Sequence, residues 1–304
     1  MKPETLTAYL APEGLVEQVV SSAGKKSKVY DRLVVAKGSP RRVVWAQNIW
    51  HEPQRLTFSS ISDAANKLRA IQRNWSLYPF TEHRRAALIS EQLPHVSASP
   101  LSFPAKLPRA SLGSWTLLDR NTLLAAASCS SPFPNGEARF KEDKHGPPNR
   151  AYLKLWEALT LIEKTPEKNS TCLEIGASPG GWTWVLASLG VQVLAVDRAL
   201  LAPEVSRQKN VRFKKGDAFS VLPGSSETFE WIFSDVACYP EKLYDWVLAW
   251  IESGKCKNVI ATLKFQGNTH YGVIDRFSAI PGGRLMHLFH NKHELTFVRL
   301  EKLV

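Results

Sequence analysis

Residues 173–183 have the sequence LEIGASPGGWT, and this stretch decides the fold class of the chain. An apolar run up to Ile175 is typical of a buried strand, the glycines that follow form a turn, and Trp182 and Thr183 begin a helix. Glycines let a turn approach a ligand closely, and the helix N-terminus behind them offers free N–H groups. The stretch therefore predicts a cofactor-binding strand–turn–helix unit.

Around this unit, short apolar runs alternate with amphipathic stretches, which predicts a mostly parallel sheet. The predicted strands are 171–176, 192–197, 211–214, 231–235, 258–264, 284–290 and 295–300. Leu243, Val247 and Trp250 recur at helical spacing, so residues 239–253 are predicted to form a helix that ends at Gly254. The last two strands follow each other closely and are expected to form a hairpin at the sheet edge. We therefore expect a Rossmann-like, seven-stranded α/β domain.

The first half of the chain is less regular and is predicted to be a smaller α+β domain. The expected helices are 12–22 and 61–71, the expected strands are 29–36 and 41–50, and a hairpin is expected from 115–118 and 122–128. Prolines and glycines crowd residues 130–148, which marks a domain boundary. The sequence therefore predicts domains at 1–140 and 141–304.

The composition excludes several classes of protein. With 304 residues, 44% hydrophobic and 22% charged, the chain is neither disordered nor a disulfide-rich miniprotein. No apolar run is long enough to span a membrane, and residues 1–20 carry acidic residues and a proline where a signal peptide would be apolar. The four cysteines stand singly and are expected to be reduced, with no metal site. We expect a cytoplasmic protein.

The charge is distributed unevenly along the chain. The net charge is +11; residues 1–150 hold 21 basic and 12 acidic side chains, whereas residues 151–304 hold 18 and 16. An excess of positive charge in one half indicates a polyanionic partner, although a basic surface without a partner is the other interpretation.

Two interpretations of the glycine turn are disfavoured. A P-loop ends in Gly-Lys-Ser/Thr, whereas this turn ends in Gly180, Gly181 and Trp182. Gly176-x-Ser178-x-Gly180 fits the nucleophile elbow of esterases, but the oxyanion hole there uses the N–H after the serine, and Pro179 has none. The residues of this turn therefore argue against both nucleotide hydrolysis and ester hydrolysis.

A nucleoside cofactor fits the turn better. Gly176 and Gly181 match two glycines of the dinucleotide motif, but Ser178 replaces the glycine that admits a pyrophosphate. S-adenosyl-L-methionine has a ribose and an adenine but no pyrophosphate. Asp197, at the end of the next strand, would accept from the ribose hydroxyls, and Asp217 would face the adenine edge. Each aspartate could instead only cap a turn.

Further residues carry a resemblance to a known family. Residues 174–183 resemble the cofactor loop of the FtsJ-type RNA ribose 2′-O-methyltransferases, and most of all its branch acting on a cytidine of large-subunit ribosomal RNA. Residues 149–155, 234–236, 262–264 and 293–297 resemble four further motifs of this family in the same order. The resemblance implies a catalytic tetrad formed by Lys154, Asp235, Lys264 and Glu294.

The resemblance also implies the rest of the site and the partner. The implied cofactor is S-adenosyl-L-methionine, and the implied partner is RNA, expected to be ribosomal, for a chain expected to be monomeric. The first domain would be a reduced, THUMP-like RNA-binding domain, because it is shorter than its counterpart in the family. The residues expected to bind the cofactor are Gly176, Ser178, Pro179, Gly180, Gly181, Trp182, Asp197, Asp217 and Asp235.

Methylation of a ribose hydroxyl needs a base, because the hydroxyl is a poor nucleophile. Lysine has an ordinary pKa of about 10.4, and enzymes bring such bases to roughly 7–8 by burial and neighbouring cations. We assign Lys264 as the base, Lys154 as its electrostatic partner, and Glu294 as the carboxylate that orients a lysine. Two other hypotheses stay open: an RNA-binding protein with a lapsed methyltransferase fold, and a methyltransferase for a small molecule or protein.

Overall fold

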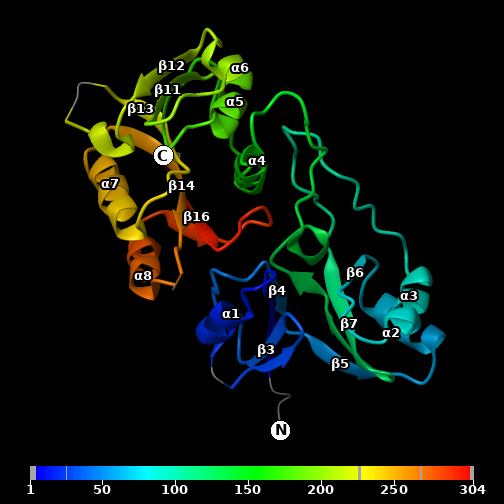
Figure 1. Cartoon of the computed structure of the whole chain (residues 1–304). Coiled ribbons are helices and arrows are strands. Elements are labelled where there is room, and N and C mark those ends of the chain that lie inside the picture. The colour runs from blue at the N-terminus through cyan, green and yellow to red at the C-terminus, as the bar shows by residue number, and fades with distance from the viewer. Residues whose placement is uncertain (1–4, 25, 225–226, 268, 302–304) are drawn as a thin grey trace. The chain divides into compact units, whose positions relative to one another are not determined.

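The structure is a computed structural model that describes residues 5–24, 26–224, 227–267 and 269–301 (Figure 1). The chain folds into two compact units. The first unit consists of residues 1–101 and 106–139, and the second of residues 102–105 and 140–304.

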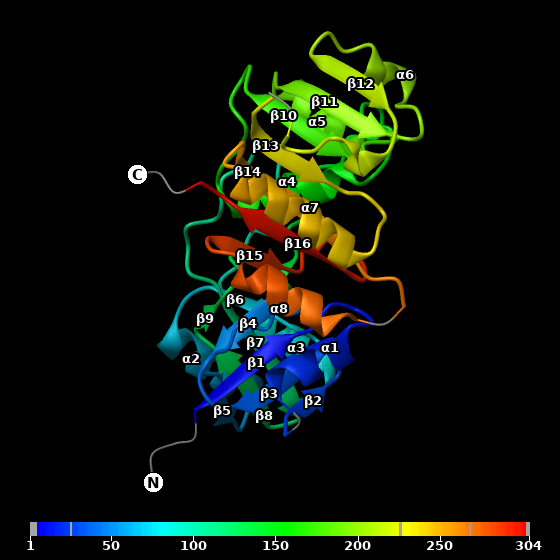
Figure 2. The same ribbon diagram turned by 90° about the vertical axis from the view of Figure 1, so that its left-hand side faces the viewer.

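The second unit is built on a seven-stranded sheet with the strand order β12-β11-β10-β13-β14-β16-β15 (Figure 2). Neighbours from β12 to β14 pair in parallel, whereas β16 pairs antiparallel with β14 and β15. The predicted seven-stranded α/β sheet with a terminal hairpin is therefore confirmed. Its strands are β10 (Thr171–Ile175), β11 (Gln192–Asp197), β12 (Val211–Lys215), β13 (Phe229–Ser234), β14 (Cys256–Lys264), β15 (Gly283–Met286) and β16 (Glu294–Arg299).

Helices cover both faces of this sheet. Figures 1 and 2 show α4 and α5 on one face and α7 and α8 on the other. The predicted helix at 239–253 is confirmed: it is α7, and Leu243, Val247 and Trp250 face the core with no measurable exposure. The helices of this unit are α4 (Tyr152–Leu161), α5 (Gly181–Ser188), α6 (Pro203–Ser206), the 3-10 turn η2 (Ala218–Ser220), α7 (Pro240–Glu252) and α8 (Tyr271–Ala279).

One strand of the second unit is shorter than predicted. The strand expected at 284–290 ends at Met286, and residues 287–293 form a turn before β16. The backbone N–H groups of Phe289 and His290 donate to the carboxylate of Glu157 on α4, so they cannot donate to a neighbouring strand. A tertiary contact to another element therefore ends this strand.

The first unit is an α+β structure with two mostly antiparallel sheets. Their strand orders are β2-β3-β1-β4-β9 and β5-β8-β7-β6. The strands are β1 (Leu6–Leu10), β2 (Lys28–Tyr30), β3 (Leu33–Lys37), β4 (Asn48–His51), β5 (Gln54–Thr57), β6 (Trp75–Leu77), β7 (Gly113–Asp119), β8 (Thr122–Ala126) and β9 (Ser128–Cys129). The helices are α1 (Val16–Ala23), α2 (Ile61–Ile71), α3 (His83–Glu91) and the 3-10 turn η1 (Pro134–Gly136).

The predicted helix at 61–71 and the predicted hairpin of β7 and β8 are confirmed. The strand expected at 29–36 is instead the hairpin of β2 and β3, because Asp31 lies in the left-handed region with φ of 54°. The strand expected at 41–50 begins only at Asn48. Residues before it form a turn, in which Val43 and Trp45 fill the core and the N–H of Arg41 donates to the Tyr9 hydroxyl.

Among the described residues, no helix has the length and apolar character that crossing a bilayer requires. The four cysteines are unpaired in the structure, and Cys172 and Cys256 are buried. Burial raises the pKa of the Cys256 thiol to about 11, so this thiol is protonated near neutral pH.

Candidate active site

Four chemistry-bearing side chains of the second unit meet at the carboxyl ends of its central strands. Asp235 directly follows β13, Lys264 is the last residue of β14, and Glu294 is the first residue of β16. The antiparallel register of β14 and β16 places Lys264 opposite Glu294. Lys154 reaches the same place from the first turn of α4. Open α/β sheets bind their ligands at this edge.

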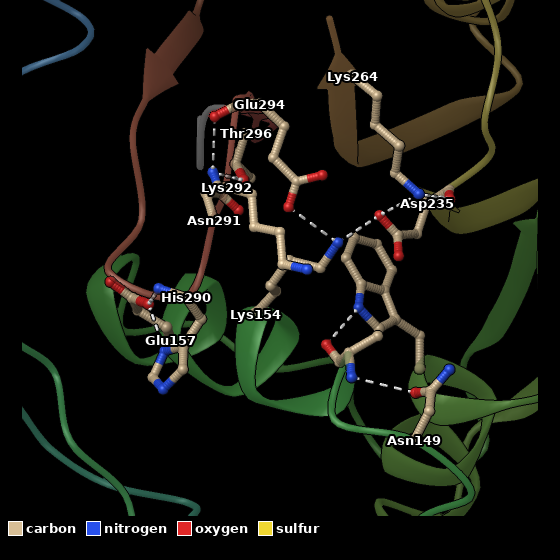
Figure 3. A network of polar contacts seen from close by, with 12 residues as sticks. Asn149, Lys154, Glu157, Asp235, Lys264, His290, Asn291, Lys292, Glu294 and Thr296 are labelled. Carbon is tan, nitrogen blue, oxygen red and sulfur yellow. Dashed lines mark hydrogen bonds and ion pairs between the residues drawn. The ribbon is translucent and has the colours of Figure 1, made fainter. Parts of the chain in front are cut away.

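These four side chains form one network of ion pairs (Figure 3). The Nζ atom of Lys154 lies 2.7 Å from Oδ1 of Asp235 and 3.2 Å from Oε1 of Glu294. The Nζ atom of Lys264 lies 3.1 Å from the same Oδ1 of Asp235 and also donates to the carbonyl oxygen of Asp235. Asp235 thus binds both lysines, and Glu294 orients Lys154.

The two lysines differ in their surroundings. The side chain of Lys154 is 10% exposed and that of Lys264 is 26% exposed. Burial alone lowers the pKa of Lys154, but the Asp235 and Glu294 carboxylates outweigh burial, so its pKa lies above its ordinary value. Lys154 therefore stays an ammonium ion near neutral pH, which suits an electrostatic partner better than a base.

The glycine turn runs from the end of β10 into α5, as predicted, and it fits closely against the rest of the unit. Gly176 has φ of +73°, and a Cβ atom there would lie 2.5 Å from the Cα atom of Val236. A Cβ atom on Gly181 would lie 2.1 Å from Oδ1 of Asn149. Gly180, with φ of +118°, caps the N-terminus of α5. These positions require glycine because of packing and backbone conformation.

Asp197 and the glycine turn are joined by hydrogen bonds. The N–H of Ser178 donates to Oδ2 of Asp197 over 3.0 Å, and the N–H of Ala199 donates to Oδ1 over 2.8 Å. The hydroxyl of Ser178 donates to the carbonyl oxygen of Leu200, and the Pro179 carbonyl accepts from a backbone N–H. Asp197 therefore holds the turn in place, and each of its oxygens keeps a further acceptor position.

Asp217 and Trp182 have structural partners of their own. Asp217 caps η2 by accepting from the N–H of Phe219 and pairs with Arg198; these contacts lower the pKa of its carboxyl group. The indole N–H of Trp182, which is 2% exposed, donates to the Ala151 carbonyl before α4. Trp182 thus joins the helix after the glycine turn to the helix that carries Lys154.

Two buried carboxyl groups near this site were not predicted from the sequence to have a role in it. Glu174 on β10 is 1% exposed and accepts from the Thr183 hydroxyl over 2.7 Å; burial raises its pKa to about 8. Glu157 on α4 is 2% exposed and binds the turn before β16. Glu157 lies one helical turn after Lys154, and that spacing was the signal that could have identified it.

The arrangement determines which cofactor chemistry the site suits. Asp197 ends β11, and Asp217 and Asp235 follow β12 and β13, which are parallel strands of the same sheet, so their carboxylates lie at one edge of the sheet. Carboxylate oxygens with open acceptor positions suit a ligand that bears hydroxyl groups. Within the described residues, no group of three or more His, Cys, Asp or Glu side chains could hold a metal ion.

Comparisons with known proteins match the part of the chain that carries this site. The model of the FtsJ-like methyltransferase family matches residues 147–266. The chain is 30% identical over 164 residues to "Ribosomal RNA large subunit methyltransferase M" of Aromatoleum aromaticum, with 49% of this chain and 44% of that protein covered. It is also 30% identical over 186 residues to the protein of that name from Alkalilimnicola ehrlichii, with coverage of 57% and 51%.

The chain thus spans about half the length of the curated relatives it matches. Among solved structures, TrmN from Thermus thermophilus aligns over 98% of this chain and 100% of that chain, with 14% identity and a TM-score of 0.40. The fold is defined by the strand order β12-β11-β10-β13-β14-β16-β15. Residues 147–266, which hold three members of the lysine–carboxylate network, match the FtsJ-like methyltransferase family, as the sequence motifs predicted.

Proposed function

We propose that this chain is an S-adenosyl-L-methionine-dependent RNA ribose 2′-O-methyltransferase that acts on ribosomal RNA. The observation that carries the proposal is the network of Lys154, Asp235, Lys264 and Glu294 at the carboxyl ends of the central strands. The FtsJ-like family match and relatives named for large-subunit ribosomal RNA methylation support the substrate class. The positive charge concentrated in residues 1–150 is consistent with an RNA partner.

The glycine turn, with Ser178, Pro179 and Trp182, and the carboxylates of Asp197, Asp217 and Asp235 would hold the cofactor. When bound, S-adenosyl-L-methionine supplies a methyl group on a positively charged sulfur. Asp197 would accept from ribose hydroxyls with the acceptor positions that its backbone bonds leave open. The fit rests on the close approach that the glycine turn allows and on the acceptor oxygens of Asp197 at the end of the neighbouring strand.

Within the tetrad, Lys264 is proposed to take the proton from the attacking ribose hydroxyl. Lys154 is the poorer base because two carboxylates hold its ammonium form. Its positive charge would instead position the hydroxyl oxygen and stabilise the negative charge that develops there. Asp235 would keep both amines close to the reacting atoms, since both contact its Oδ1 atom.

The direct test measures transfer of labelled methyl groups to ribosomal RNA isolated from cells that lack the gene. We expect transfer by the wild-type chain and at least a 100-fold lower rate for Lys264→Ala. Lys168→Ala, which removes an exposed lysine of the same unit, serves as the matched control and should keep full activity. Calorimetry should give the same cofactor affinity for both variants.

The product identifies the methylated atom. A ribose 2′-O-methyl group prevents alkaline cleavage of the adjacent phosphodiester, whereas a methyl group on a base does not. Alkali-resistant label supports the proposal, and label on the base contradicts the ribose assignment. RNA binding without any transfer would favour the RNA-binding protein with a lapsed fold, and transfer to protein alone would favour the third hypothesis.

A further inference from the structure

A second set of contacts links the elements that carry Lys154 and Glu294. Glu157 lies three residues after Lys154 on α4, hence on the same side of the helix. Its carboxylate accepts three hydrogen bonds from the turn at 287–293: from the N–H of Phe289 over 2.7 Å, from the N–H of His290 over 3.0 Å, and from Nδ1 of His290 over 2.7 Å. This turn leads directly into Glu294 (Figure 3).

The three hydrogen bonds between Glu157 and the turn, here called the Glu157 clamp, lie among buried side chains. The side chain of Glu157 is 3% exposed and that of His290 is 13% exposed. The ring of Phe140 packs on both His290 and Trp156, at centroid distances of 5.9 and 5.7 Å, and covers the clamp. Buried hydrogen bonds to a charged acceptor are strong and directional, so few positions of the turn satisfy all three.

The turn is also fixed from within. The buried His287 shares a hydrogen bond of 2.9 Å between its Nε2 and the Lys292 carbonyl. Because a carbonyl oxygen accepts, Nε2 carries the proton. The amide of Asn291 donates to the carbonyl oxygen of Glu294 and to the hydroxyl of Thr296. If the turn moved away from Glu157, these hydrogen bonds would therefore also move Glu294, the first residue of β16.

We propose that Glu157 is a positioning residue of the methyl-transfer site: by binding the turn at 287–293, it keeps Glu294 within ion-pair distance of Lys154. α4 and β16 are held by two parallel contacts, one from Glu157 to the turn and one from Lys154 to Glu294. Glu157 itself contacts no reacting atom. This inference rests on the proposed function for its effect on catalysis, but its structural part can be measured without any substrate.

The substrate-free test measures how fast Lys154 reacts with acetic anhydride, resolved residue by residue by mass spectrometry. In the wild type, ion pairs with Asp235 and Glu294 protect the Lys154 amine. Glu157→Gln places an NH₂ group against the backbone donors of the turn, so we expect at least 3-fold faster acetylation of Lys154. The exposed Lys168 provides the internal reference and should react at an unchanged rate.

His290 offers a pair of variants that leaves Glu157 in place. His290→Asn keeps a side-chain N–H donor at similar reach, whereas His290→Leu removes it. We expect wild-type protection of Lys154 with asparagine and faster acetylation with leucine. This pair decides the question if Glu157→Gln does not fold.

Asn210→Ala is the matched control, because its amide donates to the Ala187 and Val191 carbonyls of the same unit at 3.0 and 2.8 Å without touching the site. Lys154 should stay protected in this variant. Equal acetylation of Lys154 in Glu157→Gln and the wild type, or the same gain in Asn210→Ala as in Glu157→Gln, would overturn the proposal.

Kinetics then separate this proposal from the proposed function. With RNA as substrate, Glu157→Gln should lower kcat about 10- to 100-fold and change the cofactor KM less than 2-fold, since the defect concerns geometry at the reacting atoms. An unchanged kcat together with unprotected Lys154 would refute the catalytic part. If the wild type methylates no RNA, the proposed function fails, and the acetylation result still decides whether Glu157 positions Glu294.

Discussion

Replacement of Glu174 by glutamine tests the electrostatics of the central strand. Glu174 is fully enclosed on β10, and burial raises its pKa from the ordinary 4.5 to about 8. Between these values the folded chain keeps a proton that the unfolded chain has released. The contribution of Glu174 to the free energy of unfolding therefore falls as pH rises from 4.5 to 8, by about 1.4 kcal/mol per pH unit. Below pH 4.5 the contribution is fully present.

Glutamine has nearly the same shape, is never charged, and can still accept from the Thr183 hydroxyl. The stability of Glu174→Gln should therefore lack this pH dependence. Relative to the wild type, the variant should gain about 2.5 kcal/mol between pH 5.5 and 7.5, slightly less than two full units because Glu174 begins to ionise in the folded chain near pH 7.5. Taking this difference removes the contributions of all other titrating groups.

The measurement is urea denaturation of both proteins at several pH values in this window. Thr183→Val is the control for loss of the hydrogen bond alone and should be destabilised to a similar extent at each pH. A difference between Glu174→Gln and the wild type that stays constant with pH, or shrinks as pH rises, would refute the reasoning that Glu174 is protonated in the folded chain.

Three further predictions concern the same unit. Lys154→Met removes the cation between two carboxylates that are almost fully buried and should cost about 3–5 kcal/mol in urea denaturation, as well as activity. Burial lowers the pKa of His287 to about 4, so the unfolded chain alone gains a proton at this residue between pH 6.5 and 4. The contribution of His287 to stability should fall by up to about 3 kcal/mol on acidification over this range, and the stability of His287→Gln relative to the wild type should rise by that amount in the same assay. Asp197→Ala removes the hydrogen bonds from the N–H groups of Ser178 and Ala199 and should raise the cofactor Kd at least about 10-fold by calorimetry, whereas an unchanged Kd would exclude Asp197 from the cofactor site.

Much of the second unit could be predicted from local patterns. The apolar runs of its strands, the glycine turn and the helical spacing of Leu243, Val247 and Trp250 are local features, and the structure has the predicted sheet and helix. Parallel strands end at one edge, so residues at strand ends could be expected to meet there. The first unit was harder to predict, because a single left-handed residue, Asp31, turns one expected strand into a hairpin.

The periodicity of apolar residues, the glycine turns and the order of the motifs are properties of the chain, and they specify which residue types stand at the strand ends and along α4. Tertiary structure alone decided how they pair. Lys154 and Glu294 are 140 positions apart, and their 3.2 Å contact exists because the fold brings the first turn of α4 to the start of β16. The turn held by Glu157 ends a strand that local propensity would have continued. Contacts between distant segments depend on the packing of whole elements, which no local pattern encodes.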